Sequence, residues 1–208
     1  MQLKKANPTP TRFKLPITQE QCRDILTACY LAEVEGRGMT YKPTAETTLN
    51  LDKVAQWLTN ASLPFGLLLC GKVGNGKTTM LNAIKQCIAY CMDNESYQSQ
   101  IEHSLKRINA TDLYGMAKDP IGFGNIQGAK LLAIDDLGCE PAEVLDYGNV
   151  ITPAVELLSF RYERRLMTII TTNLLPRQIR EKYGDRIADR FNEMMYRIVF
   201  NNETYRIR

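Results

Sequence analysis

The sequence contains a single histidine and no cysteine pair in the C-x-x-C spacing. This shortage argues against a structural zinc site, because such sites take four Cys or His ligands close together. Four of the six cysteines instead lie at helical spacings, Cys22/Cys29 and Cys87/Cys91, which suits buried faces of helices and predicts reduced thiols. We therefore expect neither zinc nor disulfides to hold this protein together.

Long apolar runs are also missing. No segment approaches the ~20 consecutive apolar residues that a membrane-spanning helix needs, and the first residues lack the apolar run of a secretory signal. We expect a soluble, cytoplasmic protein with no membrane partner. The net charge of +3 allows a nucleic-acid partner without indicating one. The length of 208 residues suits one substantial domain with a short appendage.

Acidic residues are absent from residues 1–16, which carry four basic residues and three prolines. Such a segment cannot bury a core, so we expect a flexible arm that is either a solvated tail or a contact arm for DNA or protein. A helix should follow from Thr18, which has capping-box spacing to Gln21, and it should end near Gly36. A second helix is expected at about 51–59.

From Pro64 onward, short apolar runs alternate with longer segments of helical periodicity. Continuous apolar runs are typical of strands buried on both faces of a parallel sheet. The expected strands are 65–70, 105–110, 130–135, 166–172 and 196–200. The expected helices are 77–92, a short one after Thr111, 151–165 and 176–183. This alternation predicts an α/β fold in which helices flank a parallel sheet.

Residues 71–78, GKVGNGKT, match the phosphate-binding pattern G-x-x-x-x-G-K-[ST] in full. The match lies between an expected strand and an expected helix, which is the context that the pattern requires. Its glycines let backbone N–H groups face the phosphates at the start of the helix. We expect Lys77 to neutralise the β- and γ-phosphates and Thr78 to hold Mg²⁺. The expected nucleotide-binding residues of this loop are Gly71, Val73, Gly74, Asn75, Gly76, Lys77, Thr78 and Thr79.

Two further expected strands end in polar residues. The strand LLAIDD ends in Asp135, which is placed to bind Mg²⁺, and Asp136, which is placed to activate the attacking water as general base. An alternative role for Asp136 is to cap the following turn. The strand TIITTN ends in Asn173, whose amide can donate to the γ-phosphate or orient the water without adding charge. Asparagine is common at strand ends, so Asn173 alone is a weak indication of a nucleotide site. Its position after the loop at 71–78 and the Asp135 strand, in that order, strengthens the prediction.

Two arginines follow in the segment YGDRIADRF. Arg186 and Arg190 lie four residues apart, so they share one face of a short helix. They could pair with Asp185 and Asp189 as a solvated charged face. Alternatively, one of them is an arginine finger, a guanidinium presented to the γ-phosphate of a neighbouring subunit, which can accelerate hydrolysis roughly 10³- to 10⁵-fold.

The order of these parts resembles the AAA+ ATPases of the DnaC/IstB type, which comprise bacterial helicase loaders and ATPase subunits of transposons. The resemblance runs from about Leu67 to the end of the sequence, and it is carried by GKVGNGKTT, LLAIDDLG, SFRYERRLMTIITTNL, YGDRIADRF and VFNNETYRIR. It implies that Asn173 is sensor 1 and that Arg206 is a sensor-2-like residue at the nucleotide. It also implies that Arg190 is the arginine finger, with Arg186 beside it at the contact between subunits.

The sequence departs from the family pattern before the Asp135 strand. Family members carry a helical insertion there that is implicated in binding single-stranded DNA. Here the interval 111–130 contains Pro120 followed by Gly122, Gly124 and Gly128, which we expect to break any second helix. That expectation argues against DNA binding through this element. The segment before the core has no cysteine cluster for a zinc-bearing helicase-binding domain, and the sequence stops too soon after YRIVF for a full C-terminal lid.

The resemblance implies two functional parts: residues 1–60, a basic arm and helical segment for a partner, and residues 61–208, an AAA+ ATPase core. It further implies a slow, assembly-dependent ATPase that binds ATP and Mg²⁺, forms a homo-oligomer with ATP, and acts on a replicative helicase and on single-stranded or duplex DNA. One alternative is an IstB-like ATPase that regulates a transposase and binds duplex DNA, with Arg161, Arg164 and Arg165 as candidate contacts. Another is an ATP switch that does not hydrolyse.

Other classes of protein with a phosphate-binding loop fit less well. A small-molecule kinase is disfavoured because neither a phosphoacceptor site nor an arginine-rich lid is evident. A GTPase is disfavoured because no N-K-x-D motif, which reads the guanine base, occurs in the sequence.

Overall fold

The computed structural model describes residues 12–93, 95–141, 144–146 and 149–201. Its centre is a five-stranded sheet in the order β2-β3-β6-β1-β7, in which neighbouring strands are parallel. The strands are β1 (Gly66–Gly71), β2 (Lys106–Asn109), β3 (Leu131–Leu137), β6 (Met167–Thr172) and β7 (Met195–Phe200). The predicted parallel α/β fold and its five strands are confirmed.

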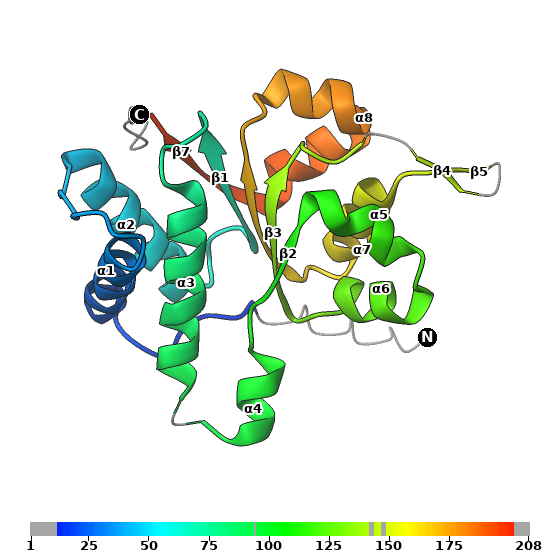
Figure 1. Cartoon of the computed structure of the whole chain (residues 1–208). Coiled ribbons are helices and arrows are strands. Elements are labelled where there is room, and N and C mark those ends of the chain that lie inside the picture. The colour runs from blue at the N-terminus through cyan, green and yellow to red at the C-terminus, as the bar shows by residue number, and fades with distance from the viewer. Residues whose placement is uncertain (1–11, 94, 142–143, 147–148, 202–208) are drawn as a thin grey trace, which may run out of the picture.

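Helices cover both faces of the sheet, as Figure 1 shows. One face carries α1 (Gln19–Glu35), α2 (Ala45–Thr59) and α3 (Lys77–Met92), with α4 (Tyr97–Glu102) following; the other carries α5 (Leu113–Ala117), α6 (Pro120–Gln127), α7 (Pro153–Glu163) and α8 (Pro176–Met194). Successive strand residues point to opposite faces, so Leu67 and Leu69 join the core with α1–α3 whereas Leu68 joins the core with α7 and α8. Burial on both faces explains why the strands read as unbroken apolar runs.

The first two helices begin at threonine caps. Thr18 and Gln21 form the predicted capping box: the N–H of Gln21 donates to Thr18 Oγ1 at 3.2 Å, and the N–H of Thr18 donates to Gln21 Oε1 at 3.0 Å. Helix α2 begins earlier than predicted, because Thr44 caps it by accepting a hydrogen bond from the N–H of Thr47 at 3.1 Å. Both helices share one apolar core with β1 and α3.

The expectation of a flexible arm is wrong for residues 12–16. The guanidinium of Arg12 stacks over the ring of Trp57 at 4.5 Å and donates to the carbonyl of the same residue at 2.5 Å. Leu15 is 1% exposed, and its N–H donates to the carbonyl of Leu58 at 2.9 Å. The ring of Trp57 and the backbone carbonyls of α2 give this segment contacts that its composition does not predict. Residues 1–11 lie outside the described residues.

The expectation that no second helix forms within 111–130 is also wrong. A 3₁₀ turn (Ala110–Asp112) and α5 are followed by α6, which begins with Pro120 at its first turn and is capped by Asp119, whose carboxylate accepts from the N–H of Ile121 at 3.2 Å. Proline at this position loses no helical hydrogen bond. The helical cost of glycine, about 1 kcal/mol each, is offset because Phe123 is buried in the core. Pro120 and the glycines therefore do not prevent a second helix in this interval.

Two further features complete the described chain. A small antiparallel hairpin of β4 (Val144–Asp146) and β5 (Asn149–Ile151) lies apart from the main sheet (Figure 1), and the sequence pattern did not predict it. Helix α8 is bent at Gly184, whose φ of 83° lies in the left-handed region that favours glycine. Among the described residues, no helix is both long and apolar enough to cross a membrane.

Arg161 of α7 is fully buried and therefore cannot contact DNA as the transposition alternative suggested. Its guanidinium donates to Thr168 Oγ1 at 2.8 Å and to the carbonyls of Gln127, Ala129 and Met167 at 3.0, 2.8 and 2.6 Å. Burial lowers its pKa to about 9. The arginine joins the segment after α6 to the start of β6. Arg164 and Arg165 remain exposed.

We predict that Arg161→Ala lowers the free energy of unfolding by about 3 kcal/mol or more, because it leaves buried carbonyls without a donor. Urea unfolding followed by circular dichroism measures the change. Arg164→Ala is the matched control, since Arg164 is exposed and stacks on Phe160 at 3.7 Å, and it should cost less than about 1 kcal/mol. Equal effects of the two substitutions would contradict a structural role for Arg161.

Candidate nucleotide-binding site

The predicted phosphate-binding loop connects β1 to α3, with the start of α3 facing the carboxyl end of the sheet. Gly76 has φ 91°, a backbone conformation that other residues rarely adopt. A Cβ at Gly71 would lie 2.3 Å from the carbonyl oxygen of Phe200 and 2.5 Å from Asn75 Nδ2. The loop thus passes too close to the end of β7 for any side chain at position 71.

Asn75 and Lys77 hold the loop from inside. Asn75 is 1% exposed, and its Nδ2 donates to the carbonyl of Phe200 at 2.6 Å. Lys77 Nζ donates to the carbonyls of Gly71 and Lys72 at 2.9 and 2.7 Å and to Asn75 Oδ1 at 3.1 Å. These three oxygens accept hydrogen bonds from the ammonium group of Lys77, as phosphate oxygens would. Burial lowers the pKa of Lys77, and the nearby carboxylates act in the opposite direction.

Asp135 lies at the carboxyl end of β3 and is 1% exposed. Its Oδ1 accepts hydrogen bonds from Thr78 Oγ1 at 3.2 Å and from Thr171 Oγ1 at 2.5 Å, and its Oδ2 accepts from the guanidinium of Arg107 at 2.5 Å. The hydroxyl of Thr78 and the carboxylate of Asp135, the two predicted Mg²⁺ ligands, therefore lie together. Oxygen ligands of this kind suit Mg²⁺, which uses one or two protein ligands besides phosphate and water.

Asp136 adopts an unusual backbone conformation. Its φ of 55° is left-handed, and the pairing of β3 with β6 shifts register between Ile134 and Leu137. Such conformations cost of order 1–3 kcal/mol and occur often at functional sites. The N–H of Asp136 donates to Thr171 Oγ1 at 2.8 Å. One buried hydroxyl therefore fixes the side chain of Asp135 and the backbone of Asp136.

Asn173 follows directly after β6 and is exposed. Its neighbour Thr172 pairs with Leu137 of β3, so the ends of β3 and β6 lie side by side. The sequence did not reveal the roles of Thr171 and Arg107. Repeated threonines in TIITT are a weak sign, and Arg107 resembles any charged residue on an edge strand.

The two predicted inter-subunit arginines face the end of α7. The side chain of Arg190 is 10% exposed; its guanidinium lies 3.2 Å from Glu163 Oε1 and 4.7 Å from the ring centroid of Tyr162. Arg186 lies 3.8 Å from the same carboxylate, but 76% of its side chain is exposed. Asp185 and Asp189 do not pair with these arginines as the ion-pair alternative proposed. They pair with Arg180. Arg206 lies outside the described residues.

Helix α8 is tied to the loop that follows Asp136. Glu140 is 5% exposed and accepts hydrogen bonds from the N–H of Gly138 at 2.8 Å and from the hydroxyl of Tyr183. Lys182 Nζ lies 3.6 Å from the same carboxylate and donates to the carbonyl of Gly138 at 2.7 Å. Burial and the bond to Glu140 raise the pKa of Tyr183. These contacts join the helix that carries the two arginines to the segment beyond β3.

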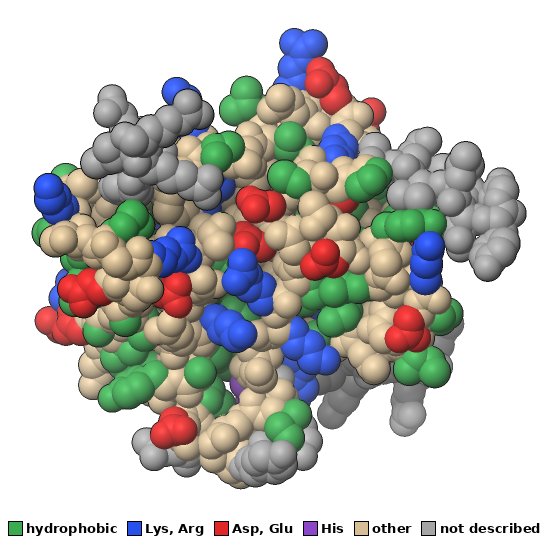
Figure 2. Space-filling model, in the orientation of Figure 1, with side chains coloured by type: hydrophobic (Ala, Val, Ile, Leu, Met, Phe, Trp, Pro, Cys, Tyr) green, Lys and Arg blue, Asp and Glu red, His purple; other side chains and the backbone are tan. Residues whose placement is uncertain are grey.

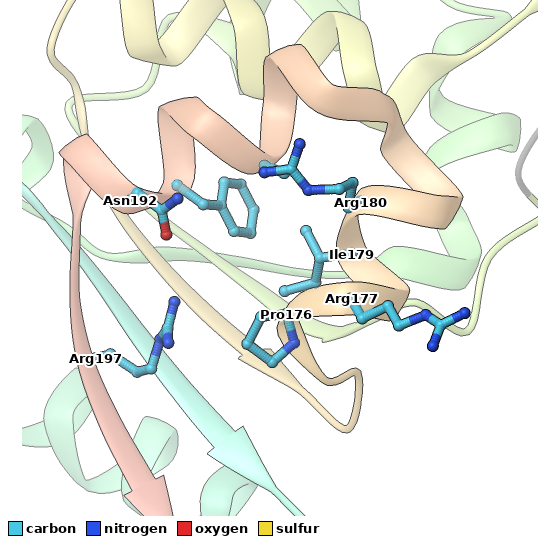
Figure 3. Close-up of a pocket in the computed structure, with 8 residues that line it drawn as sticks. Pro176, Arg177, Ile179, Arg180, Asn192 and Arg197 are labelled. Carbon is cyan, nitrogen blue, oxygen red and sulfur yellow. The ribbon is translucent and has the colours of Figure 1, made fainter.

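A separate hollow of about 240 Å³ lies beside α8 and β7 (Figure 3). Its apolar lining comes from α8, and Arg197 enters it from β7. The lining residues are Pro176, Arg177, Ile179, Arg180, Ala188, Phe191, Asn192 and Arg197. None of them belongs to the phosphate-binding loop, so this hollow is distinct from the candidate nucleotide site.

The sheet order and the loop together define a P-loop NTPase fold of the AAA+ type, as the sequence resemblance predicts. The sequence matches no protein-family model and no curated protein. Solved structures are similar. The DnaC helicase loader has a TM-score of 0.59 and 17% identity over 77% of this chain and 93% of that chain. DnaI has a TM-score of 0.53 and 20% identity over 94% and 97%.

The replication initiator DnaA, in a structure bound to AMPPCP and single-stranded DNA, has a TM-score of 0.54 and 17% identity over 76% of this chain and 48% of that chain. At these identities the similarity establishes the fold. The DnaC-like AAA+ fold predicted from the sequence is thereby confirmed.

We predict that Thr171→Val lowers the free energy of unfolding by about 1–3 kcal/mol, because it leaves a buried carboxylate oxygen and the N–H of Asp136 without their shared partner. Chemical denaturation measures the loss. Thr40→Val is the control, because Thr40 is exposed and should change stability by less than about 0.5 kcal/mol. A neutral Thr171→Val would show that the hydroxyl does not hold the site.

Proposed function

We propose that this protein binds ATP·Mg²⁺ at residues 71–79 and hydrolyses ATP. The observation that carries the proposal is the 3.2 Å contact between Thr78 Oγ1 and Asp135, at the edge of the sheet where the phosphate-binding loop also lies. Mg²⁺ would be held by these two residues and would neutralise charge on the phosphates. Lys77 would exchange its loop carbonyls for phosphate oxygens, and Thr79, which is 6% exposed, would pack into the first turn of α3.

Asp136 would act as general base for the attacking water, and Asn173 would orient that water. The bulge at the end of β3 supports this assignment, because it separates the orientation of Asp136 from that of the metal-binding Asp135. Two carboxylates that are adjacent in sequence would thus have different roles, Asp135 as a metal ligand and Asp136 as general base. Arg206 is proposed as the sensor-2-like contact to the nucleotide.

Hydrolysis is proposed to require a neighbouring subunit. Arg190 is engaged with Glu163 and Tyr162 of its own chain, so it would have to leave these contacts to reach a neighbour's γ-phosphate. One buried nitrogen of its guanidinium, Nη1, has no hydrogen-bond partner among the described residues, which favours such a rearrangement. The isolated subunit would then be a slow ATPase, and the homo-oligomer formed with ATP would be the active one.

The cellular role is proposed to be that of a helicase-loader-like replication factor acting on a replicative helicase and DNA. The similarity to the DnaC helicase loader and to DnaI over most of this chain supports it. Residues 1–60 are proposed to contact the helicase, and the α5–α6 insertion is available for DNA. The IstB-like transposition role keeps Arg164 and Arg165 as its exposed basic residues.

We predict that Lys77→Ala abolishes nucleotide binding whereas Asp136→Asn retains binding and slows hydrolysis at least about 100-fold, the scale of general-base catalysis. Equilibrium binding of a fluorescent ATP analogue and phosphate release measure the two effects. With ATP, Asp136→Asn used as bait in the native host should retain a replicative helicase, and Lys77→Ala should not. Capture of a transposase instead would favour the transposition role, and normal turnover by Asp136→Asn would exclude it as the base.

We predict that the turnover per subunit rises with protein concentration and that Arg190→Ala lowers it about 10³-fold. Arg177→Ala is the matched control on the same helix, because Arg177 is 88% exposed and pairs with Glu181. Comparable losses of turnover in Arg190→Ala and Arg177→Ala, or turnover that does not depend on protein concentration, would contradict the role of Arg190 as an arginine finger. A loss in Arg186→Ala alone would assign that role to the more exposed arginine.

A further inference from the structure

Arg107 forms the one ion pair that the described residues give to Asp135. It lies on β2, the outermost strand beside β3, and reaches across to the carboxylate with one nitrogen at 2.5 Å. Its other terminal nitrogen donates to Asn82 Oδ1 of α3 at 3.0 Å. Figure 2 shows lysine and arginine side chains gathered over this edge of the sheet, close to acidic ones. Asn82 of α3 and Asp135 of β3 thus both bind the guanidinium, which lies against the predicted metal ligand.

Both oxygens of the Asp135 carboxylate accept hydrogen bonds from donors of the chain itself. Thr78 and Thr171 bind Oδ1, and Arg107 binds Oδ2. The side chain of Asp135 is 2% exposed, and a charged carboxylate so deeply buried needs a compensating positive charge. The guanidinium of Arg107 supplies it at 2.5 Å. Lys77 is meanwhile bound to carbonyls of its own loop.

We propose that Arg107 takes the place of Mg²⁺ at Asp135 when no nucleotide is bound, and that Mg²⁺ must displace it. The inference rests on the proposed function of the site. Both cations would bind the same carboxylate, so each would weaken the binding of the other at this position. Arg107 thereby stabilises the site in the absence of nucleotide and sets the Mg²⁺ concentration at which nucleotide binds.

Asn82 of α3 positions Arg107 and is itself bound by Glu33 of helix α1. Asn82 Nδ2 donates to Glu33 Oε2 of α1 at 2.9 Å, and Gln86 Nε2 donates to Glu33 Oε1 at 2.5 Å. Because the amide nitrogen of Asn82 is bound to Glu33 of α1, its carbonyl oxygen faces Arg107. Asn82 is a positioning residue, and its loss should weaken the hold of Arg107 on Asp135 without removing the charge.

The test is a Mg²⁺ titration of the binding of a fluorescent ATP analogue to the full chain. Arg107→Gln should lower the half-saturating Mg²⁺ concentration about tenfold, the size expected for loss of one hydrogen bond between charged groups. Lys106→Gln removes an exposed charge from the same strand and should behave as the unaltered protein. An unchanged or increased Mg²⁺ requirement in Arg107→Gln would overturn the inference. If the unaltered protein binds no nucleotide at any Mg²⁺ concentration, the proposed function fails as well.

Two further variants keep the test decisive if Arg107→Gln folds poorly. Asn82→Ala should lower the Mg²⁺ requirement two- to threefold, and no change would count against the inference. Without nucleotide and Mg²⁺, Arg107→Gln should lower the melting temperature, but it should add little to the effect of Asp135→Asn, because the charge that it compensates is then gone. Additive losses would show that the two side chains do not stabilise one another.

Discussion

The carboxyl ends of β1, β3 and β6 meet at one edge of the sheet because the three strands run parallel. This constraint brings together the phosphate-binding loop, Asp135 with Asp136, and Asn173, although the sequence separates them widely. Ligands of open α/β sheets bind at this edge for the same reason. Burial of both sheet faces fixes the strands in place, so the geometry of the site depends on the apolar layers above and below it.

Buried polar groups specify how the elements join within that frame. Arg161 connects α7 with the segment after α6 and the start of β6, Thr171 connects β6 with the end of β3, and Glu140 connects the loop after β3 with α8. Each of these groups is satisfied by hydrogen bonds, as burial of a polar group requires. Together they link the site to the helix that carries Arg186 and Arg190.

The N-terminal helices belong to the same core as the sheet, and they also approach the site through polar contacts. Glu33 of α1 binds Asn82 of α3, and Asn82 binds Arg107, which reaches Asp135. A continuous series of contacts of this kind provides a physical connection between a candidate partner-binding segment and the proposed metal ligand Asp135. Under the proposed function, loop carbonyls bind Lys77 where phosphate oxygens would bind, and the guanidinium of Arg107 binds Asp135 where Mg²⁺ would bind.

Local patterns in the sequence were sufficient to predict the loop between β1 and α3, the parallel α/β fold and the capping box of α1. These features follow from periodicity, caps and glycine spacing, which act over a few residues. The sequence alone did not reveal that Arg161 is buried, that α6 forms despite its glycines, or that Arg107 pairs with Asp135. Those outcomes depend on which strands become neighbours and in what register, and on burial that outweighs local propensity, so only the tertiary structure could decide them.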